Sequence, residues 1–319
     1  MLTHLARAMW LMLLTSACTA ETFPTQPVRI VAATPPGGAA DVNARRLADK
    51  LSRMWKQPVV VQNLSGGAGN VAASAVAQAT ANGYTLLFAA HPVLAVNPLL
   101  YQKLPFDPDR DFRPIVLLSK MPHVLLASPA LPATTVRELI ALAKARPGSL
   151  NYGSGGAGTS IHLAGELLAD TARVDIRHVP YRGGAPAVTA LIGGEIQLLF
   201  DATATAIGHI RGGRVRAIAI ASGKRSQVLP DVPTFAEDGV RGMESVIAHA
   251  ILVPAKTSAS MTTTLNRAIN ETLHDPDYMR QMTDFGADLI GGSPADLQTF
   301  LAAERTKWAE LIRKRDIKS

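Results

Sequence analysis

The chain has 319 residues, of which 47% are hydrophobic, 18% charged and 5% aromatic, and its formal net charge is +7. This composition supports a sizeable buried core and excludes an intrinsically disordered chain. The single cysteine excludes an intrachain disulfide and a cysteine-based zinc or iron–sulfur site. At about 150 residues per domain, the length predicts two domains or one large one.

The first 20 residues have the pattern of a secretory signal peptide. Arg7 supplies a positive charge, a short apolar core follows, and small residues end the segment at Ala20. No apolar run in the sequence reaches the roughly 18 residues needed to span a bilayer. We therefore predict a periplasmic protein. The alternative is a lipoprotein signal ending at Cys18, which is disfavoured because Thr15 stands where such a signal usually has an aliphatic residue.

Strand and helix patterns alternate in the first third of the chain, which is typical of an α/β fold with mainly parallel strands. The predicted elements are, in order, a strand over 28–33, a helix over 41–55, a strand over 59–61, an Ala-rich helix ending at Ala79 and a strand over 84–89. A Pro- and Asp-rich stretch, 105–114, then interrupts the alternation. The apolar segment 115–127 is predicted to cross to a second lobe.

The second half of the chain resumes the alternation. Thr135 and Glu138 form a capping box that opens a helix. The elements after it are a strand over 150–152, a helix over 159–170, a strand over 176–179, a helix ending at Gly193 and strands over 196–200 and 215–221. Segment 246–253 is apolar and is predicted to cross back. Helices over 260–273 and 294–313 close the chain, the last with Ser293 as its N-cap.

Glycine-rich turns stand at four predicted strand-to-helix junctions. They cover residues 36–41, 66–70, 154–160 and 182–185. A helix start carries unpaired N–H groups and a partial positive charge, and glycine lets the backbone approach a ligand closely. In an open α/β sheet such turns gather at the carboxyl ends of the strands, so two lobes could close on one small anion. The alternative for any single turn is that its glycines serve only to form a tight turn or a helix C-cap and bind no ligand.

Other chemistries receive weaker support from the sequence. Segment 153–158 matches G-x-G-x-x-G, but the strand before it is short and Asp175 opens the next strand instead of ending it, which disfavours a dinucleotide site. Ser154, His162 and Asp201 could in principle form a triad, although nothing marks Ser154 as a strained nucleophile. Alternatively, His162 is simply packed and Asp201 caps the helix that follows.

Neither a metal nor a nucleic acid is expected. The eight histidines show no metal-ligand spacing, and no cofactor motif is complete. Basic residues gather near the C-terminus, but only Trp308 lies among them, whereas a nucleic-acid surface usually interleaves aromatic side chains with cations. Basic residues there also suit the end of a helix. A small anion is the more natural partner for a basic exported protein.

Three long motifs stand in order along the chain. They are PPGGAADVNARRLADKL at 35–51, NYGSGGAGTSIHLAGELL at 151–168 and VPYRGGAPAVTALIGGEIQLLFD at 179–201. Together with shorter motifs, they resemble the tripartite tricarboxylate transporter receptors, also called Bug-type solute-binding proteins. The resemblance spans nearly the whole chain beyond the signal peptide. It implies a two-lobed, type II-like periplasmic binding protein with two crossing strands as its hinge, which captures a small mono-, di- or tricarboxylate and passes it to membrane permease subunits.

The resemblance also implies where the ligand binds. The expected ligand-binding residues are Pro36, Gly37, Gly38, Asp41 and Gly69 of the first lobe, Ser154, Gly158, Thr159 and Ser160 of the second, and Asp201 and Thr203 on its rim. His91 is expected near the cleft. Arg182 could meet a second carboxylate, because arginine forms paired hydrogen bonds with such groups, or it could be a solvated loop cation.

The expected organisation is a signal peptide at 1–20, a first lobe of 21–123 with 250–319, and a second lobe of 124–249. We expect a non-enzymatic monomer. A sensor that presents its ligand to a membrane kinase and a hydrolase on the same scaffold are the alternatives. One departure from the family pattern is the stretch 246–251, where an aromatic-and-glycine sequence is usual, so hinge behaviour or ligand shape could differ.

Overall fold

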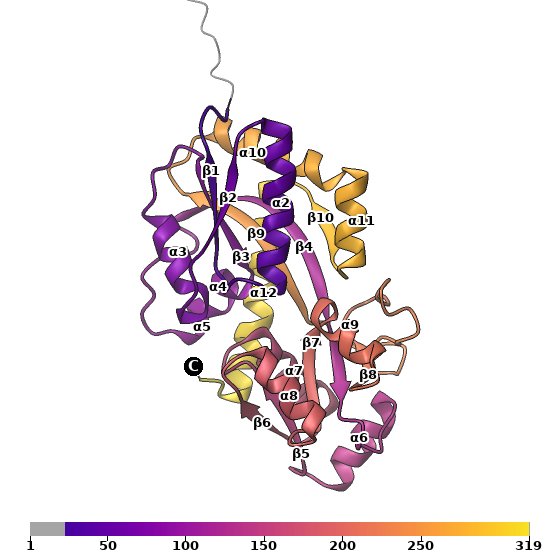
Figure 1. Cartoon of the computed structure of the whole chain (residues 1–319). Coiled ribbons are helices and arrows are strands. Elements are labelled where there is room, and N and C mark those ends of the chain that lie inside the picture. The colour runs from indigo at the N-terminus through magenta and orange to yellow at the C-terminus, as the bar shows by residue number, and fades with distance from the viewer. Residues whose placement is uncertain (1–22, 319) are drawn as a thin grey trace, which may run out of the picture.

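The computed structural model describes residues 23–318 (Figure 1). The predicted signal peptide, with Cys18, lies outside the described residues. A single curled sheet runs through the molecule in the strand order β2-β1-β3-β9-β4-β7-β5-β6, and β10 and β8 also pair with β4. Two lobes are built around the two ends of this sheet, the first above and the second below in Figure 1.

The first lobe contains three parallel strands, one short antiparallel strand and the helices that cover them. Its strands are β1 (Val28–Ala32), β2 (Val59–Asn63), β3 (Thr85–Ala90) and β10 (Asp288–Gly291). Its helices are α2 (Ala39–Trp55), η1 (Gly67–Gly69), α3 (Asn70–Ala77), α4 (Pro92–Ala95), α5 (Asn97–Leu100), α10 (Ala259–Leu273) and α11 (Pro276–Asp284). The 3.6-residue apolar period of α2 buries Ala44, Leu47 and Leu51 against the sheet, whereas Met54, on the same apolar face of the sequence, is exposed.

The second lobe repeats the strand–turn–helix pattern. Its strands are β5 (Leu150–Ser154), β6 (Ile176–Pro180), β7 (Leu198–Ala202) and β8 (Arg216–Ile220). Its helices are α6 (Val136–Ala145), α7 (Ser160–Ala172), α8 (Gly184–Gly193) and α9 (Thr203–Arg211). Strand β5 runs parallel to both β6 and β7. A separate core fills this lobe, centred on buried side chains such as Tyr152, Phe200 and Phe235.

Two long strands join the lobes, as predicted. They are β4 (Phe112–Ala127) and β9 (Val246–Pro254), which pair antiparallel with Met121 opposite Ile247. The first part of β4 pairs with β10 of the first lobe, and its last part pairs with β7 and β8 of the second. We call this pair the hinge ribbon. Both strands are buried along most of their length, which explains why each is predominantly apolar, with Ser119, Lys120 and His123 as the polar interruptions near the middle of β4 and His249 in β9.

Helix α12 (Pro294–Arg315) also spans the two lobes. Its first half packs on the first lobe through Leu297, and its second half packs on α7 of the second lobe through Trp308 and Leu311. Ser293 caps this helix in a full capping box, as predicted. No helix among residues 23–318 has the length and apolar content of a membrane span.

Candidate ligand site

A cavity of about 180 Å³ lies between the lobes, against the hinge ribbon. Its walls come from the first-lobe turn after β1, the first turn of α2, the end of β3, the hinge ribbon and the first residue of α7. The lining residues are Ala33, Thr34, Ala39, Ala40, Phe88, Ala90, Met121, Ser160, Ile247 and His249. We call it the front cavity. It brings the starts of one helix from each lobe to the same small space.

The first-lobe turn borders this cavity through Thr34, Ala39 and Ala40, while the glycines between them are not among the lining residues. Pro36, Gly37 and Gly38 are all exposed, and Gly38 is the N-cap of α2 with no side-chain hydrogen bond to the helix. The first hydrogen bond of the helix runs from the Val42 amide to the Gly38 carbonyl at 3.0 Å. The amides of Ala39 and the next two residues therefore precede the helical ladder and carry the positive end of the helix dipole.

The Asp41 side chain fixes the first-lobe turn through hydrogen bonds. Its buried carboxylate accepts hydrogen bonds from the Gly37 amide at 2.9 Å, from Asn63 at 2.8 Å and from Arg45 at 3.0 Å. Burial alone would raise the pKa of Asp41, but the bonds from Arg45, Gly37 and Asn63 outweigh it and lower the pKa. Asp41 thus stays ionised and positions the turn.

The second-lobe turn, between β5 and α7, is held by neutral side chains. Ser154, at the end of β5, is fully buried, and its Oγ lies 2.6 Å from His178 Nε2 and donates to the Gly156 carbonyl at 3.0 Å. Thr159 is the N-cap of α7 and accepts from the His162 amide at 3.3 Å. The His162 ring in turn accepts from the Gly158 amide at 3.0 Å. Ser160 follows as the first helical residue and lines the front cavity.

Behind this turn, aromatic rings and ion pairs form a packed cluster. The rings of His162 and His178 stack with centroids 3.9 Å apart. Burial lowers the pKa of both rings, and the neighbouring His162 helps to bring that of His178 to about 4. Tyr152 donates to Glu166 at 2.5 Å, and Arg315 of α12 donates to the same carboxylate at 2.7 Å. The cluster fixes the second-lobe turn and ties it to the C-terminal helix.

The hinge ribbon supplies wall residues that the sequence reasoning did not identify. Met121 of β4 and Ile247 and His249 of β9 face the front cavity. Asn43 Nδ2, which can only donate, lies 3.3 Å from His249 Nδ1, so the neutral ring carries its proton on Nε2. Burial lowers the pKa of His249 to about 3, with a further contribution from His91. The sequence predicted the β9 segment as a crossing strand, and its departure from the family pattern at 246–251 indicated a possible effect on ligand shape, but neither signal identified these side chains as wall residues.

Of the thirteen expected site residues, Ser160 is the one that lines the front cavity. Three of the others, Gly69, His91 and Arg182, make their contacts elsewhere or are open to solvent. Gly69 is buried behind Ala33, a wall residue, and a side chain there would meet Val93 at 2.6 Å. The buried His91 ring accepts from the Ala248 amide at 3.2 Å and lies 3.2 Å from Glu304. Arg182 is exposed in the turn after β6, and no hydrogen bond or ion pair among the described residues involves it. Its guanidinium is open to solvent.

Asp201 and Thr203 were expected on the rim of the cleft, with Asp201 as a possible cap of the helix that follows. Asp201 lies inside β7, opposite Val124, and accepts from the amide of Ala202, which is the N-cap of α9, so Asp201 is not the cap. Burial raises its pKa to about 6. Thr203 donates to the Gly286 carbonyl of the first lobe at 3.2 Å. The two lobes therefore touch beside α9.

The catalytic-triad alternative is not assembled. Ser154 contacts His178 and not His162, and the Nδ1 of His162 is occupied by the Gly158 amide. The acid near the His162 ring is Glu166, at 3.9 Å, and Asp201 bonds to its own segment. Ser154 is also buried, so its hydroxyl holds the turn instead of facing a substrate.

Comparison with known proteins agrees with this architecture. The sequence profile of the family described as "Tripartite tricarboxylate transporter family receptor" matches residues 43–317. Protein BugT of Bordetella pertussis is 35% identical over 296 residues, which cover 92% of this chain and 91% of BugT. Among solved structures, Rpa4515 of R. palustris with adipate has a TM-score of 0.85 and 34% identity, covering 93% of this chain and 99% of that one. MatC of Rhodopseudomonas palustris with bound malate has a TM-score of 0.80 and 30% identity, covering 91% and 100%.

Proposed function

Since the chain belongs to the tripartite tricarboxylate transporter receptor family, we propose that it captures a small organic carboxylate in the front cavity. The observation that carries this proposal is that the first turns of α2 and α7, one from each lobe, line the same cavity. The unpaired amides and the positive dipole ends of two helices then face one ligand, which favours an anion. Relatives solved with adipate and malate support the carboxylate class.

The residues that line the cavity indicate which groups would bind the carboxylate of the ligand. It contains no lysine or arginine, so the carboxylate would be held by amides, by the Ser160 hydroxyl and by the Nε2–H of His249. A volume of about 180 Å³ is below the ~300–1,000 Å³ of drug-sized pockets, which favours a small ligand. Phe88, Met121 and Ile247 would pack against its hydrocarbon part.

We further propose that the two lobes close over the ligand by bending at the hinge ribbon. The predicted lobe boundaries, at 123/124 and 249/250, fall inside β4 and β9. Strand β4 pairs with β10 of the first lobe and with β7 and β8 of the second, and β9 pairs with β4 and with β3 of the first lobe. Closure would be selected by contacts that the ligand makes with both turns at once. In this account the protein is a periplasmic, non-enzymatic monomer that hands its ligand to membrane permease subunits.

A thermal-shift screen of mono-, di- and tricarboxylates, followed by calorimetry on the best compound, tests the proposal. A ligand at 100 times its Kd should raise the free energy of unfolding by about 2.7 kcal/mol, which is a clear shift in melting temperature. If no carboxylate raises the melting temperature while an uncharged analogue such as an amide does, the proposed ligand class is wrong.

A further inference from the structure

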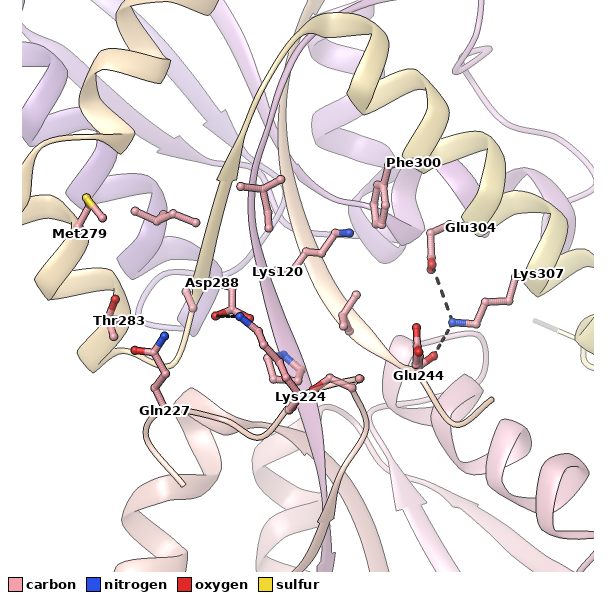
Figure 2. Close-up of a pocket in the computed structure, with 17 residues that line it drawn as sticks. Lys120, Lys224, Gln227, Glu244, Met279, Thr283, Asp288, Phe300, Glu304 and Lys307 are labelled. Carbon is pink, nitrogen blue, oxygen red and sulfur yellow. Dashed lines mark hydrogen bonds and ion pairs between the residues drawn. The ribbon is translucent and has the colours of Figure 1, made fainter. Parts of the chain in front are cut away.

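A larger cavity, of about 710 Å³, lies on the opposite face of the hinge ribbon (Figure 2). Side chains alternate between the two faces of a strand. Met121 and Ile247 therefore face the front cavity, while Lys120, Pro122 and Val246 face the larger one. We call it the rear cavity. The hinge ribbon is the partition between the two.

Both lobes contribute to the rear cavity. The first lobe provides β10 and the side chains of α11, the second lobe provides the segment 222–227 and Glu244, and α12 closes one side. The Lys224 ammonium of the second lobe lies 3.2 Å from the Asp288 carboxylate of β10, so an ion pair bridges the lobes along this wall (Figure 2).

Lys120 is the cation of this cavity that lacks an acidic partner. Its ammonium lies 4.4 Å from the centre of the Phe300 ring, and no ion pair among residues 23–318 involves it. Lys307 lies on the same wall, donates to the Glu244 carbonyl at 2.5 Å and is 3.8 Å from the Glu304 carboxylate. Burial lowers the pKa of Lys307, the carboxylates of Glu304 and Glu244 oppose this effect, and repulsion from Lys120 adds a smaller lowering. An anion between the two ammonium groups would relieve that repulsion.

The acids of the rear cavity are largely committed to other groups. Asp288 is paired with Lys224. Glu304 lies 3.2 Å from His91 and accepts from the Trp308 indole at 2.7 Å. The contacts from His91, Lys307 and Trp308 outweigh its burial and lower the pKa of Glu304 to about 2. The Glu244 carboxylate is the one acid of this cavity whose side chain makes no hydrogen bond or ion pair among residues 23–318, and it lies on the Lys307 side of the wall.

Apolar side chains face this cavity without a covering partner. Met279 and Ile290 are each 46% exposed, among the most exposed large hydrophobic side chains of the described residues. Phe300, Leu289 and Val246 continue this surface toward the ribbon. A cavity with a cation at one point and open apolar surface beside it suits a ligand with an acidic head and a hydrocarbon body.

We propose that the rear cavity is a second binding site, for a small carboxylate with an aromatic or aliphatic body. The carboxylate meets the ammonium groups of Lys120 and Lys307. The hydrocarbon body lies against Phe300, Ile290 and Met279. This inference does not depend on what the front cavity binds.

The two cavities can be observed separately because each has a methionine in its wall. Methionine methyl groups labelled with ¹³C are followed by NMR during titration with benzoate, and Met279→Leu and Met121→Leu spectra assign the two signals. We expect benzoate to shift the Met279 signal saturably. Lys120→Gln should weaken that binding at least tenfold, whereas Lys103→Gln, an exposed lysine outside both cavities, should leave it unchanged.

Three results would overturn the proposal. The first is an unshifted Met279 signal in the unmodified chain, which no folding defect could cause. The second is an equal response to inorganic sulfate, which would mean that the hydrocarbon body contributes nothing. The third is unchanged affinity in Lys120→Gln. A shift of Met121 alone would place benzoate in the front cavity, refuting the rear site while supporting the proposed function.

Discussion

The two turns that meet at the front cavity present the same chemistry but are built differently. The first-lobe turn is anchored by a buried carboxylate, that of Asp41. The second-lobe turn is anchored by neutral groups, through His162 and Thr159. The first turn is also open, since a side chain at Gly38 would make only ordinary contacts, whereas a side chain at Gly158, with φ at 75°, would meet Leu100 at 2.5 Å.

The comparison shows that two unrelated sets of side chains can position the N-terminus of a helix at an anion-binding cavity. The first set depends on a full charge and the second on neutral hydrogen-bonding groups. The two turns should therefore respond differently to charge removal, to added side chains and to acid.

The largest effect is expected from Asp41→Ala. Removing the carboxylate leaves the Gly37 amide and the Arg45 guanidinium without this acceptor and leaves Asn63 with the Thr34 carbonyl alone, which should lower the free energy of unfolding by about 3 kcal/mol. Denaturant unfolding measures this. The matched control is Asp49→Ala on the same helix, whose ion pair with Arg53 is exposed and should contribute less than about 0.5 kcal/mol. Equal losses would mean that Asp41 does not anchor the turn.

Gly38→Val should come next and should act on binding instead of folding. Its φ is −79° and the surrounding space is open, so the variant should melt within a few degrees of the unmodified protein. The added side chain would block the anion's approach to the start of α2, and we expect about a 100-fold loss of affinity by calorimetry, or about 2.7 kcal/mol. Gly193→Val, at another open glycine, is the control. Unchanged affinity in Gly38→Val would remove the first turn from the site.

Mild acid should weaken the second turn before the first. The pKa of His178 is lowered to about 4 by burial and by His162, so its contribution to stability is present above its ordinary value of 6.5 and is lost as pH falls from 6.5 toward 4. The pKa of Asp41 is lowered from 3.8, so its contribution is lost only below that value. Because the His178 ring is partly exposed, we expect it to account for about 2 kcal/mol.

His178→Gln is the variant that measures this contribution. Its unfolding free energy should fall less steeply than that of the unmodified protein between pH 6.5 and 4. The unfolding free energy of Asp201→Asn should fall more steeply than that of the unmodified protein over the same range. The reason is that the pKa of Asp201 is raised to about 6, so its contribution to stability is lost as pH rises through that value. Parallel pH profiles for all three proteins would contradict the assignment.

Ser160→Ala should cost less, about tenfold in affinity. It removes one hydroxyl from the cavity wall but keeps the backbone amides and the dipole of α7. Calorimetry with the best carboxylate measures the loss, and Ser74→Ala on α3, away from the cavity, should show none. If both variants bind equally well, the ligand does not reach the second lobe at Ser160.

The smallest expected effect is that of Arg182→Ala. An exposed guanidinium without an internal partner could reach only the far end of a long ligand, so dicarboxylates should lose about threefold in affinity and monocarboxylates should be unaffected. Arg137→Ala, another exposed arginine of the second lobe, serves as the control. Equal losses for both ligand classes would show that Arg182 does not touch a second carboxylate.

Much of the fold followed from local patterns. The hinge ribbon was predicted because 115–127, which follows the Pro- and Asp-rich interruption at 105–114, and 246–253 are apolar segments, and they correspond to β4 and β9. The caps at Thr135 and Ser293 were predicted because side-chain-to-backbone bonds depend on nearby residues alone. The short elements α4, α5, α11 and β10 were not predicted, because tertiary packing rather than a long period stabilises them.

The candidate site was predictable only in part. The turns around Gly38 and Ser160 were found because a glycine-rich junction is a sequence pattern. The ribbon residues Met121, Ile247 and His249 were missed, since strands buried on both faces show no two-residue alternation that would reveal which side faces a ligand. Asp41 was predicted to contact the ligand. That contact stays a prediction, and the sequence did not reveal that the same carboxylate accepts hydrogen bonds from its own turn and from β2.

The most direct measurement is a crystal structure of this chain with the carboxylate that binds best in the thermal-shift screen. The account predicts a carboxylate in the front cavity, with oxygens about 2.9 Å from amides in the first turn of α2 and from Ser160 of α7. A carboxylate bound elsewhere, with solvent alone between these two helix starts, would contradict it.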